Sequence, residues 1–302
     1  MISVVIPVYN EEKNIKENIR EICRYLEKYE YELILVDDGS RDRTWEFIKE
    51  LYSEKSSIKG IRFSRNFGKE IALCAGVDYA GGEAVITMDS DLQHDPKYID
   101  ELIENWRNGY KIVECTRKKR VNQSLRYKLM AGTFYKILRK LTGLDLANSL
   151  DYKIIDRKVV EDIKKLNESN VFFRGFVEWV GYDKKQIEID VGERKGDSTK
   201  FSFKSLVKLA TTAITAFSSS LLSLVTLLGM LFMFGAIILG TYTIVNKVLG
   251  NAVDGFSTVI ILLLIVGSCI LFSLGIIGTY IGRIYTEVKM RPRYIVTETV
   301  QK

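Results

Sequence analysis

Hydrophobic residues in the N-terminal two thirds of the chain occur in short runs separated by polar segments. Three runs rich in β-branched residues predict strands at Ile2–Pro7, Glu32–Val36 and Glu83–Met88, and Ile58–Phe63 and Lys111–Cys115 supply further strands. Helical spacing follows the first two runs, at Ile15, Ile19, Ile22 and Leu26 and then at Trp45, Ile48 and Leu51. This alternation predicts an α/β fold with a mostly parallel sheet.

The C-terminal third has a different pattern. No Asp, Glu, Lys, Arg or His occurs from Leu209 to Asn246 or from Gly255 to Gly282. Each stretch exceeds the roughly 20 apolar residues that span a bilayer, and buried core helices are rarely uncharged on every face for so long. We therefore predict an interfacial amphipathic helix over residues 205–220, two transmembrane helices with a short outer loop within 221–282, and an extended tail over 283–302.

Flanking charges predict the orientation of these spans. Lys200, Lys204 and Lys208 precede the first span, and Arg283, Lys289, Arg291 and Arg293 follow the second. The N-terminus reads as a strand and carries no signal peptide pattern. We expect an integral membrane protein whose soluble domain, residues 1–204, and both termini are cytosolic.

The four cysteines have no paired spacing, so we expect reduced thiols and neither a disulfide framework nor a zinc site.

Basic residues are concentrated in a few places. The formal net charge is +6, and much of the excess lies in Arg117–Arg120 and beside the predicted spans. This distribution points to anionic lipid or phosphate as a partner, and not to nucleic acid. A single lysine among them is equally well explained as part of a solvated surface.

Acidic turns follow three of the predicted strands. The first strand ends in Pro7–Glu12, the second in Asp37–Ser40, and the third in Asp89–Gln93. Ligands of open parallel sheets bind beyond the carboxyl ends of the strands, so we expect one site there. Asp89 and Asp91 would offer hard oxygen ligands to Mg²⁺ or Mn²⁺, although acidic turns also cap helices. Ser40 or Asp42 would serve as such a cap after the second turn.

Five motifs and the two spans together resemble the polyprenyl-phosphate glycosyltransferases of glycosyltransferase family 2, which include dolichyl-phosphate mannose synthases and bactoprenol glucosyltransferases. The resemblance covers nearly the whole chain. It rests on the two spans and on Val5–Glu12, Val36–Ser40, Ser64–Glu70, Met88–Gln93 and Asp151–Arg157. It implies a GT-A nucleotide-binding domain, a nucleotide-sugar donor linked to UDP or GDP, and a polyprenyl phosphate acceptor.

The resemblance also implies roles for individual residues. It places the nucleotide sugar at Pro7, Tyr9, Glu11, Val36, Asp38, Asp89, Ser90, Arg194 and Lys200, the divalent metal at Asp91, Gln93 and Asp89, and the catalytic groups at Asp151, Asp91 and Arg117. Arg117, Arg126 and Lys128 would bind the acceptor phosphate, a task suited to basic side chains. Where the family often has a third acid after the glutamine, this chain has His94, which we interpret as a loop residue.

The implied acceptor needs no activating base. A phosphate monoester has a second pKa of about 6 and is largely dianionic at neutral pH, so Asp151 would orient a sugar hydroxyl or stabilise positive charge on the sugar ring. Attack of the acceptor phosphate on the anomeric carbon of the sugar would invert the configuration of that carbon.

The segment Val121–Leu141 is either an amphipathic helix on the lipid surface or an ordinary packed helix. UDP-glucose is the first choice of donor, with GDP-mannose, UDP-galactose and UDP-N-acetylhexosamines as alternatives.

Two other functions share part of this pattern. A processive polysaccharide synthase would carry a Gln-x-x-Arg-Trp motif and more spans, and the sequence has neither. A non-catalytic membrane scaffold or transporter subunit would also bind a nucleotide, but the predicted spans contain no Asp, Glu, Lys, Arg or His that would mark a transport path. The tail Arg291–Val296 reads as an extended segment that pairs with a neighbouring subunit, which predicts a homo-oligomer, with a tetramer among the options.

Overall fold

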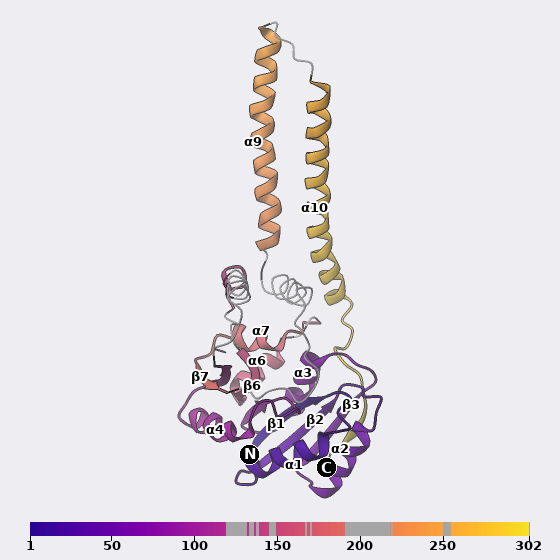
Figure 1. The fold of residues 1–302 in the computed structure, drawn as a ribbon, viewed down its shortest axis with the longest axis vertical. Coiled ribbons are helices and arrows are strands. Elements are labelled where there is room, and N and C mark those ends of the chain that lie inside the picture. The colour runs from indigo at the N-terminus through magenta and orange to yellow at the C-terminus, as the bar shows by residue number, and fades with distance from the viewer. Residues whose placement is uncertain are drawn as a thin grey trace. The chain divides into compact units, whose positions relative to one another are not determined.

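The computed structural model describes residues 1–118, 132, 136, 139–144, 149–166, 168–169, 171–190, 218, 220–249 and 255–301. The chain divides into two compact units. The sheet unit comprises Met1–Phe201 and Arg291–Lys302, and the helical unit comprises Ser202–Met290. Figure 1 shows the elements of both units.

From β1 to β5 the elements of the sheet unit alternate between strand and helix, as the hydrophobic pattern predicts. In chain order they are β1 (Ile2–Val8), α1 (Ile15–Leu26), β2 (Tyr31–Asp37), α2 (Thr44–Glu54), β3 (Ile58–Phe63), α3 (Lys69–Tyr79), β4 (Ala84–Thr87), η1 (Pro96–Tyr98), α4 (Ile99–Arg107), β5 (Ile112–Arg117), β6 (Ser149–Asp156), α6 (Arg157–Lys164), α7 (Phe173–Trp179), β7 (Lys184–Ile189) and β8 (Val296–Val300). The described strands form one sheet in the order β7-β5-β6-β4-β1-β2-β3-β8.

Parallel pairing dominates the centre of this sheet. Strands β4, β1, β2 and β3 run parallel, with Val5 opposite Ile34 on one side and Thr87 on the other. Strand β6 pairs antiparallel with both β4 and β5, while β7 runs parallel to β5. Because helices cover both faces of the central strands, β1 is buried along its whole length, in keeping with a sequence that is apolar except for Ser3.

Helices α1, α2 and α4 pack on one face of the sheet, over a core that includes Val4, Ile6, Leu33 and Leu35. Helices α3, α6 and α7 contact one another on the other face. There the approach of α3 to the sheet depends on Gly76, because a Cβ at that position would lie 2.1 Å from Val5 Cγ1. The close fit brings the N-terminus of α3 to the carboxyl ends of β1 and β2.

The last strand returns to the sheet unit from the end of the helical unit. Strand β8 pairs antiparallel with β3, with Arg62 opposite Glu298, and Trp45 Nε1 donates a hydrogen bond to Glu298 Oε2 at 2.8 Å. The tail therefore pairs with β3 of its own chain, where the sequence led us to expect a neighbouring subunit. An edge strand such as β3 offers unpaired backbone groups, and the nearest extended segment of the same chain satisfies them.

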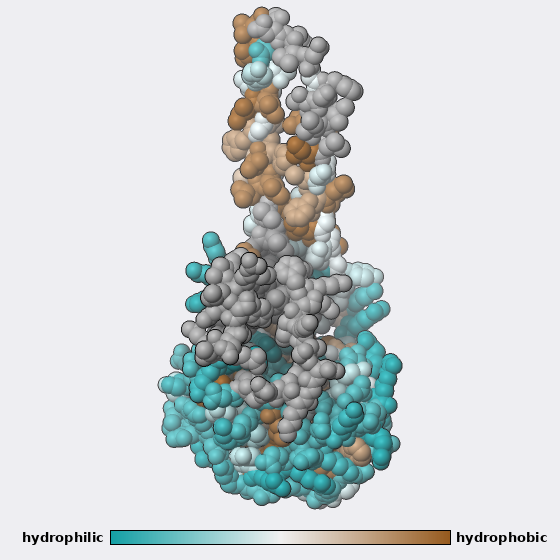
Figure 2. All heavy atoms as spheres, viewed as in Figure 1, coloured by the Kyte–Doolittle hydropathy of each residue, from teal (hydrophilic) through white to brown (hydrophobic). Residues whose placement is uncertain are grey.

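The helical unit contains α9 (Ser220–Val248) and α10 (Phe256–Val288). Within them Val225–Asn246 and Ile265–Val288 are long and apolar enough to cross a membrane, and none of either window is buried in this structure. Figure 2 shows hydrophobic residues gathered along both helices. Helix α10 continues past the predicted end of the span at Gly282, so the segment after Arg283 is not extended throughout. Neither Gly nor Pro occurs between Gly282 and Pro292 to stop the helix.

Candidate active site

A cavity of about 370 Å³ lies at the carboxyl ends of β1, β2 and β4. The residues that line it come from the three acidic turns and from the start of α3: Pro7, Val8, Tyr9, Glu11, Asp38, Asn66, Gly68, Lys69, Asp89, Ser90 and Asp91. The structure thus brings together seven of the predicted site residues. Val36 is completely buried in β2 and does not line this cavity, because strand alternation turns its side chain toward Gly76 of α3.

Asp38 organises the wall of the cavity. Its carboxylate accepts hydrogen bonds from Phe67 N at 2.6 Å and from Gly68 N at 2.9 Å, which fixes the loop before α3. Burial raises the pKa of Asp38 in spite of these bonds. Gly39 permits the adjoining turn, since its φ is 71° and a Cβ there would lie 2.4 Å from the backbone carbon of Arg65. Asp38 therefore has a structural task in addition to any ligand contact.

The turn after β4 presents two carboxylates to the cavity. Asp89 Oδ1 lies 2.5 Å from Lys69 Nζ, and the exposed Asp91 accepts a hydrogen bond from Gln93 N at 3.1 Å. Gln93 Nε2 is buried without a hydrogen-bond partner among the described residues. Leu92 between them has a φ of 53°, a conformation that costs energy for a non-glycine residue and is common at functional sites.

His94 lies beneath this turn. Its ring is buried against Tyr152, with the two ring centroids 5.9 Å apart, and its Nδ1 is 3.9 Å from Asp89 Oδ2, too far for a hydrogen bond. Burial lowers the pKa of His94, although Asp89 opposes this. The ring therefore packs against Tyr152 without a hydrogen bond to Asp89.

Asp151 on β6 is almost completely buried and is held by two cations. Arg174 Nε and Nη2 donate to its two oxygens at 2.5 and 2.6 Å, and Lys69 Nζ lies 2.7 Å from Oδ2. Burial alone would raise the pKa of Asp151, but the hydrogen bonds and charge of Arg174, together with Lys69, hold it below the usual range. An ionised carboxylate with so low a pKa is a poor proton acceptor at neutral pH.

Sequence reasoning assigned no role to Lys69 or Arg174. Lys69 falls within Ser64–Glu70, one of the motifs behind the family resemblance, so this motif could have indicated a functional role for Lys69. Arg174 belongs to α7, and its pairing with Asp151 across the fold leaves no local sequence pattern. Glu70 joins the same region, because its Oε2 accepts a hydrogen bond from Phe173 N at 2.7 Å and so ties α3 to α7.

The structure describes one of the predicted phosphate-binding residues. Arg117 is at the end of β5 and lines neither of the two described cavities. Arg126, Lys128, Arg194 and Lys200 lie outside the described residues, as does nearly all of the predicted interfacial helix. Their roles stay predictions.

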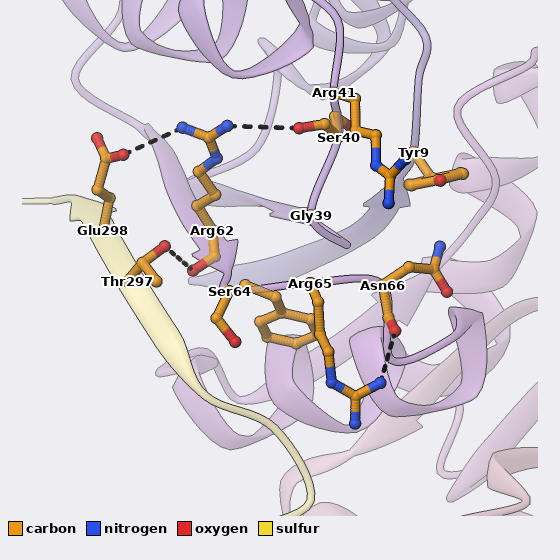
Figure 3. Close-up of a pocket in the computed structure, with 11 residues that line it drawn as sticks. Tyr9, Gly39, Ser40, Arg41, Arg62, Ser64, Arg65, Asn66, Thr297 and Glu298 are labelled. Carbon is orange, nitrogen blue, oxygen red and sulfur yellow. Dashed lines mark hydrogen bonds and ion pairs between the residues drawn. The ribbon is translucent and has the colours of Figure 1, made fainter.

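A second cavity of about 430 Å³ adjoins the first and shares Tyr9 and Asn66 with it. Figure 3 shows Arg62 between Glu298 of β8 and Ser40, and Arg41 and Arg65 also line the cavity. Arg62 Nη1 donates to Glu298 Oε1 at 3.1 Å, and its Nε lies 3.5 Å from Asp37 Oδ2. The C-terminal tail therefore contributes directly to this wall.

The part of the sequence that contains the three acidic turns matches a known family. The model of glycosyl transferase family 2 matches residues 3–164, more than half of the chain. The chain belongs to glycosyltransferase family 2. The matched region contains β1 to β6 and therefore every acidic turn of the cavity.

Individual relatives extend this family assignment along the whole chain. An uncharacterized glycosyltransferase of Bacillus subtilis (strain 168) is 39% identical over 98% of this chain and 93% of its own. The bactoprenol glucosyl transferase of Shigella phage SfII is 37% identical over 99% of this chain and 98% of its own. These matches confirm the resemblance to polyprenyl-phosphate glycosyltransferases, and the protein is a glycosyltransferase.

A solved structure confirms the fold. Glucosyl-3-phosphoglycerate synthase from Mycobacterium tuberculosis, in complex with Mn²⁺, UDP-glucose and phosphoglyceric acid, superposes with a TM-score of 0.51 at 19% identity. The match covers 71% of this chain and 77% of that one. The predicted GT-A fold with a mostly parallel sheet is therefore correct for this family 2 glycosyltransferase.

Proposed function

We propose that this family 2 glycosyltransferase transfers a sugar from a nucleotide donor, with UDP-glucose as the first choice, to a polyprenyl phosphate. The proposal depends above all on the cavity at the ends of β1, β2 and β4, where Asp38, Asp89 and Asp91 converge. The near full-length relatives named bactoprenol glucosyl transferase support a bactoprenol-type lipid as acceptor.

The two adjoining cavities would share one donor molecule. In this proposal the base and ribose lie near Pro7, Tyr9, Glu11 and Asp38, and the diphosphate and sugar extend past Asp89 and Ser90. Tyr9 and Asn66 line both cavities, so a ligand that contacts these two residues would border both. Arg194 and Lys200 remain the proposed partners of the diphosphate.

The residues of the acidic turn fit a divalent cation, Mg²⁺ or Mn²⁺. Asp89 and Asp91 offer hard carboxylate oxygens to one cavity, and in this proposal the amide oxygen of Gln93 is a further hard ligand. A cation held by two carboxylates would have ligand positions left for phosphate oxygens. A bound cation would neutralise charge on the departing diphosphate.

The chain's own side chains would prepare both reactants. A lipid phosphate oxygen forms a bond to the anomeric carbon as the bond from that carbon to the diphosphate breaks, so the configuration inverts. Arg117, Arg126 and Lys128 would hold the dianionic acceptor phosphate, which needs no base. Asp151, kept ionised by Arg174 and Lys69, would orient a sugar hydroxyl or stabilise positive charge developing on the ring.

Membrane anchoring would place the enzyme beside its acceptor. We propose that α9 and α10 cross the bilayer, that residues 205–220 lie along the interface, and that residues 1–204 and both termini face the cytosol. Large exposed apolar side chains such as Phe234, Ile238 and Leu271 support this, because exposure of so large an apolar surface to water is unfavourable. A homo-oligomer remains part of the proposal.

A donor screen tests the proposed function. Membranes containing the protein, Mn²⁺ and polyprenyl phosphate are expected to transfer labelled glucose from UDP-glucose to the lipid, and GDP-mannose, UDP-galactose and UDP-N-acetylhexosamines serve as comparison donors. A different donor would change the sugar and keep the reaction class. Binding of nucleotide without transfer from any donor would favour a scaffold, and a growing polymer would favour a processive synthase.

The tail strand supplies a further prediction. Glu298→Ala removes the partner of both Arg62 and Trp45, so we expect UDP to bind about fivefold more weakly, as for the loss of one net hydrogen bond. Titration calorimetry on the full chain in detergent measures this. Thr299→Ala, at the exposed neighbouring position that lines neither cavity, is the matched control. Equal affinities for the two variants would contradict a role for the tail.

A further inference from the structure

Lys69 lies where two acidic groups of the candidate active site meet. Its Nζ is 2.5 Å from Asp89 Oδ1 and 2.7 Å from Asp151 Oδ2, so one ammonium group joins the turn after β4 to strand β6. The Lys69 side chain is 41% exposed, Asp89 is 25% exposed and Asp151 is 1% exposed. Lys69 therefore reaches its two partners from the open side of the cavity.

The backbone of Lys69 is held by neighbouring side chains, whereas among the described residues its ammonium group is held through the two ion pairs alone. Asp38 holds the loop before α3 through Phe67 and Gly68, and Glu70 ties the first turn of α3 to Phe173. The Lys69 side chain lines the cavity as a flexible four-carbon stem. Its ammonium group can release one carboxylate without any movement of the helix.

The two partners of Lys69 differ in what else holds them. Asp151 is also bound by both Nε and Nη2 of Arg174, so its charge stays compensated if Lys69 moves. Asp89 faces the cavity and is 25% exposed, and in the described part of the chain the ion pairs of Arg174 go to Asp151 and not to Asp89. Asp89 is therefore the partner that Lys69 gives up more easily.

We propose that Lys69 is a positioning residue that competes with a divalent cation for Asp89. The inference rests on the proposed function, in which Asp89 and Asp91 hold that cation. In the free protein Lys69 neutralises Asp89 and disfavours a second cation beside it. When a nucleotide diphosphate is present, its oxygens attract the ammonium group and supply further cation ligands, so Lys69 leaves Asp89 and keeps Asp151.

The consequence is that cation and donor bind together. Lys69 makes the site a poor binder of the cation alone and a good binder of the cation with its nucleotide. Because such coupling is reciprocal, the cation strengthens nucleotide binding by the same factor. A purely structural lysine would produce no such dependence, since its replacement would loosen the site for the cation with and without nucleotide.

Binding of Mn²⁺ to the full chain in detergent, followed by its electron paramagnetic resonance signal with and without UDP, tests this. Lys69→Met is expected to bind free Mn²⁺ about tenfold more tightly than the unmodified protein. UDP should therefore increase the Mn²⁺ affinity of this variant by a correspondingly smaller factor. Lys69→Arg keeps the charge and should stay within about twofold of the unmodified protein. Lys97→Met, which removes an exposed lysine paired with Asp95, is the matched control and should have no effect.

The outcomes separate this inference from the proposed function. If Asp91→Ala abolishes Mn²⁺ binding while Lys69→Met binds it no more tightly than the unmodified protein, competition by Lys69 is overturned and the proposed metal site stands. Equal tightening by Lys69→Arg would also overturn it, because the charge would then be irrelevant. If Asp91→Ala binds Mn²⁺ normally, the metal site of the proposed function is wrong, and the assignment to Lys69 is wrong with it.

Discussion

Asp91→Ala is expected to lower sugar transfer to polyprenyl phosphate by about 10²- to 10³-fold, the usual cost of removing one electrostatic contact to developing charge. Asp91 lines the cavity and is exposed, and its recorded contact is a hydrogen bond within its own turn, to Gln93 N. Its loss should therefore leave folding intact and remove a ligand for the cation. The measurement is transfer of labelled glucose from UDP-glucose in membranes supplied with Mn²⁺.

Glu101→Ala provides the comparison for this experiment. Glu101 is an exposed carboxylate in the first turn of α4, on the same stretch of chain, and it lines neither cavity. It carries the same charge, so a general effect of net charge on membrane attachment or lipid access would appear in both variants. Full transfer by Asp91→Ala, or an equal loss in Glu101→Ala, would contradict a specific role for Asp91.

Arg174→Met is expected to cause the largest loss of stability, about 3 kcal/mol of the free energy of unfolding. It leaves the almost fully buried Asp151 with Lys69 as its remaining cation, and removal of one partner of a buried ion pair typically costs about 3–5 kcal/mol. We expect the lower end because Lys69 remains and the Arg174 side chain is 34% exposed. Urea unfolding of the full chain in detergent, followed by tryptophan fluorescence, measures the change.

Two comparisons identify the source of this loss. The double variant Arg174→Met/Asp151→Asn should recover part of the stability, because no uncompensated buried charge remains and Lys69 still has Asp89. Arg20→Met breaks an exposed pair with Glu54 and should leave the unfolding midpoint unchanged. If the double variant is less stable than Arg174→Met, the loss comes from packing and not from the charge of Asp151.

The double variant also bears on the reaction. Its restored stability should not be accompanied by restored transfer, because the charge of Asp151 is absent from it. Since Arg174 and Lys69 keep the pKa of Asp151 low, the carboxylate remains ionised throughout the neutral range. Asp151 would then act through its fixed negative charge and not as a proton acceptor.

Sequence patterns only a few residues long predicted the central strands of the fold and the first helices. The strands at Ile2–Val8 and Tyr31–Asp37 and the helix at Ile15–Leu26 follow from runs and spacings only a few residues long. Their alternation implies parallel pairing through right-handed crossovers, which places the three acidic turns at one edge of the sheet. Seven predicted site residues meet in one cavity for that reason.

Val36 and the tail show where local patterns were insufficient. Which face of β2 carries Val36 depends on the packing of α3, and its side chain lies in the core instead of the cavity. The tail has an extended sequence, yet its partner strand β3 is far away along the chain. Nothing in a short window of sequence specifies which edge a strand will join.

The sequence by itself determined the five strands from β1 to β5, the helices after the first two of them, the two apolar helices and the acidic turn at Asp89–Asp91, because each depends on side chains that are near neighbours along the chain. The tertiary structure alone decided that Lys69 and Arg174 enclose Asp151 and that Glu298 completes the wall beside Arg62. These contacts join distant segments, and their energies arise only after the sheet and its helices have packed and excluded water.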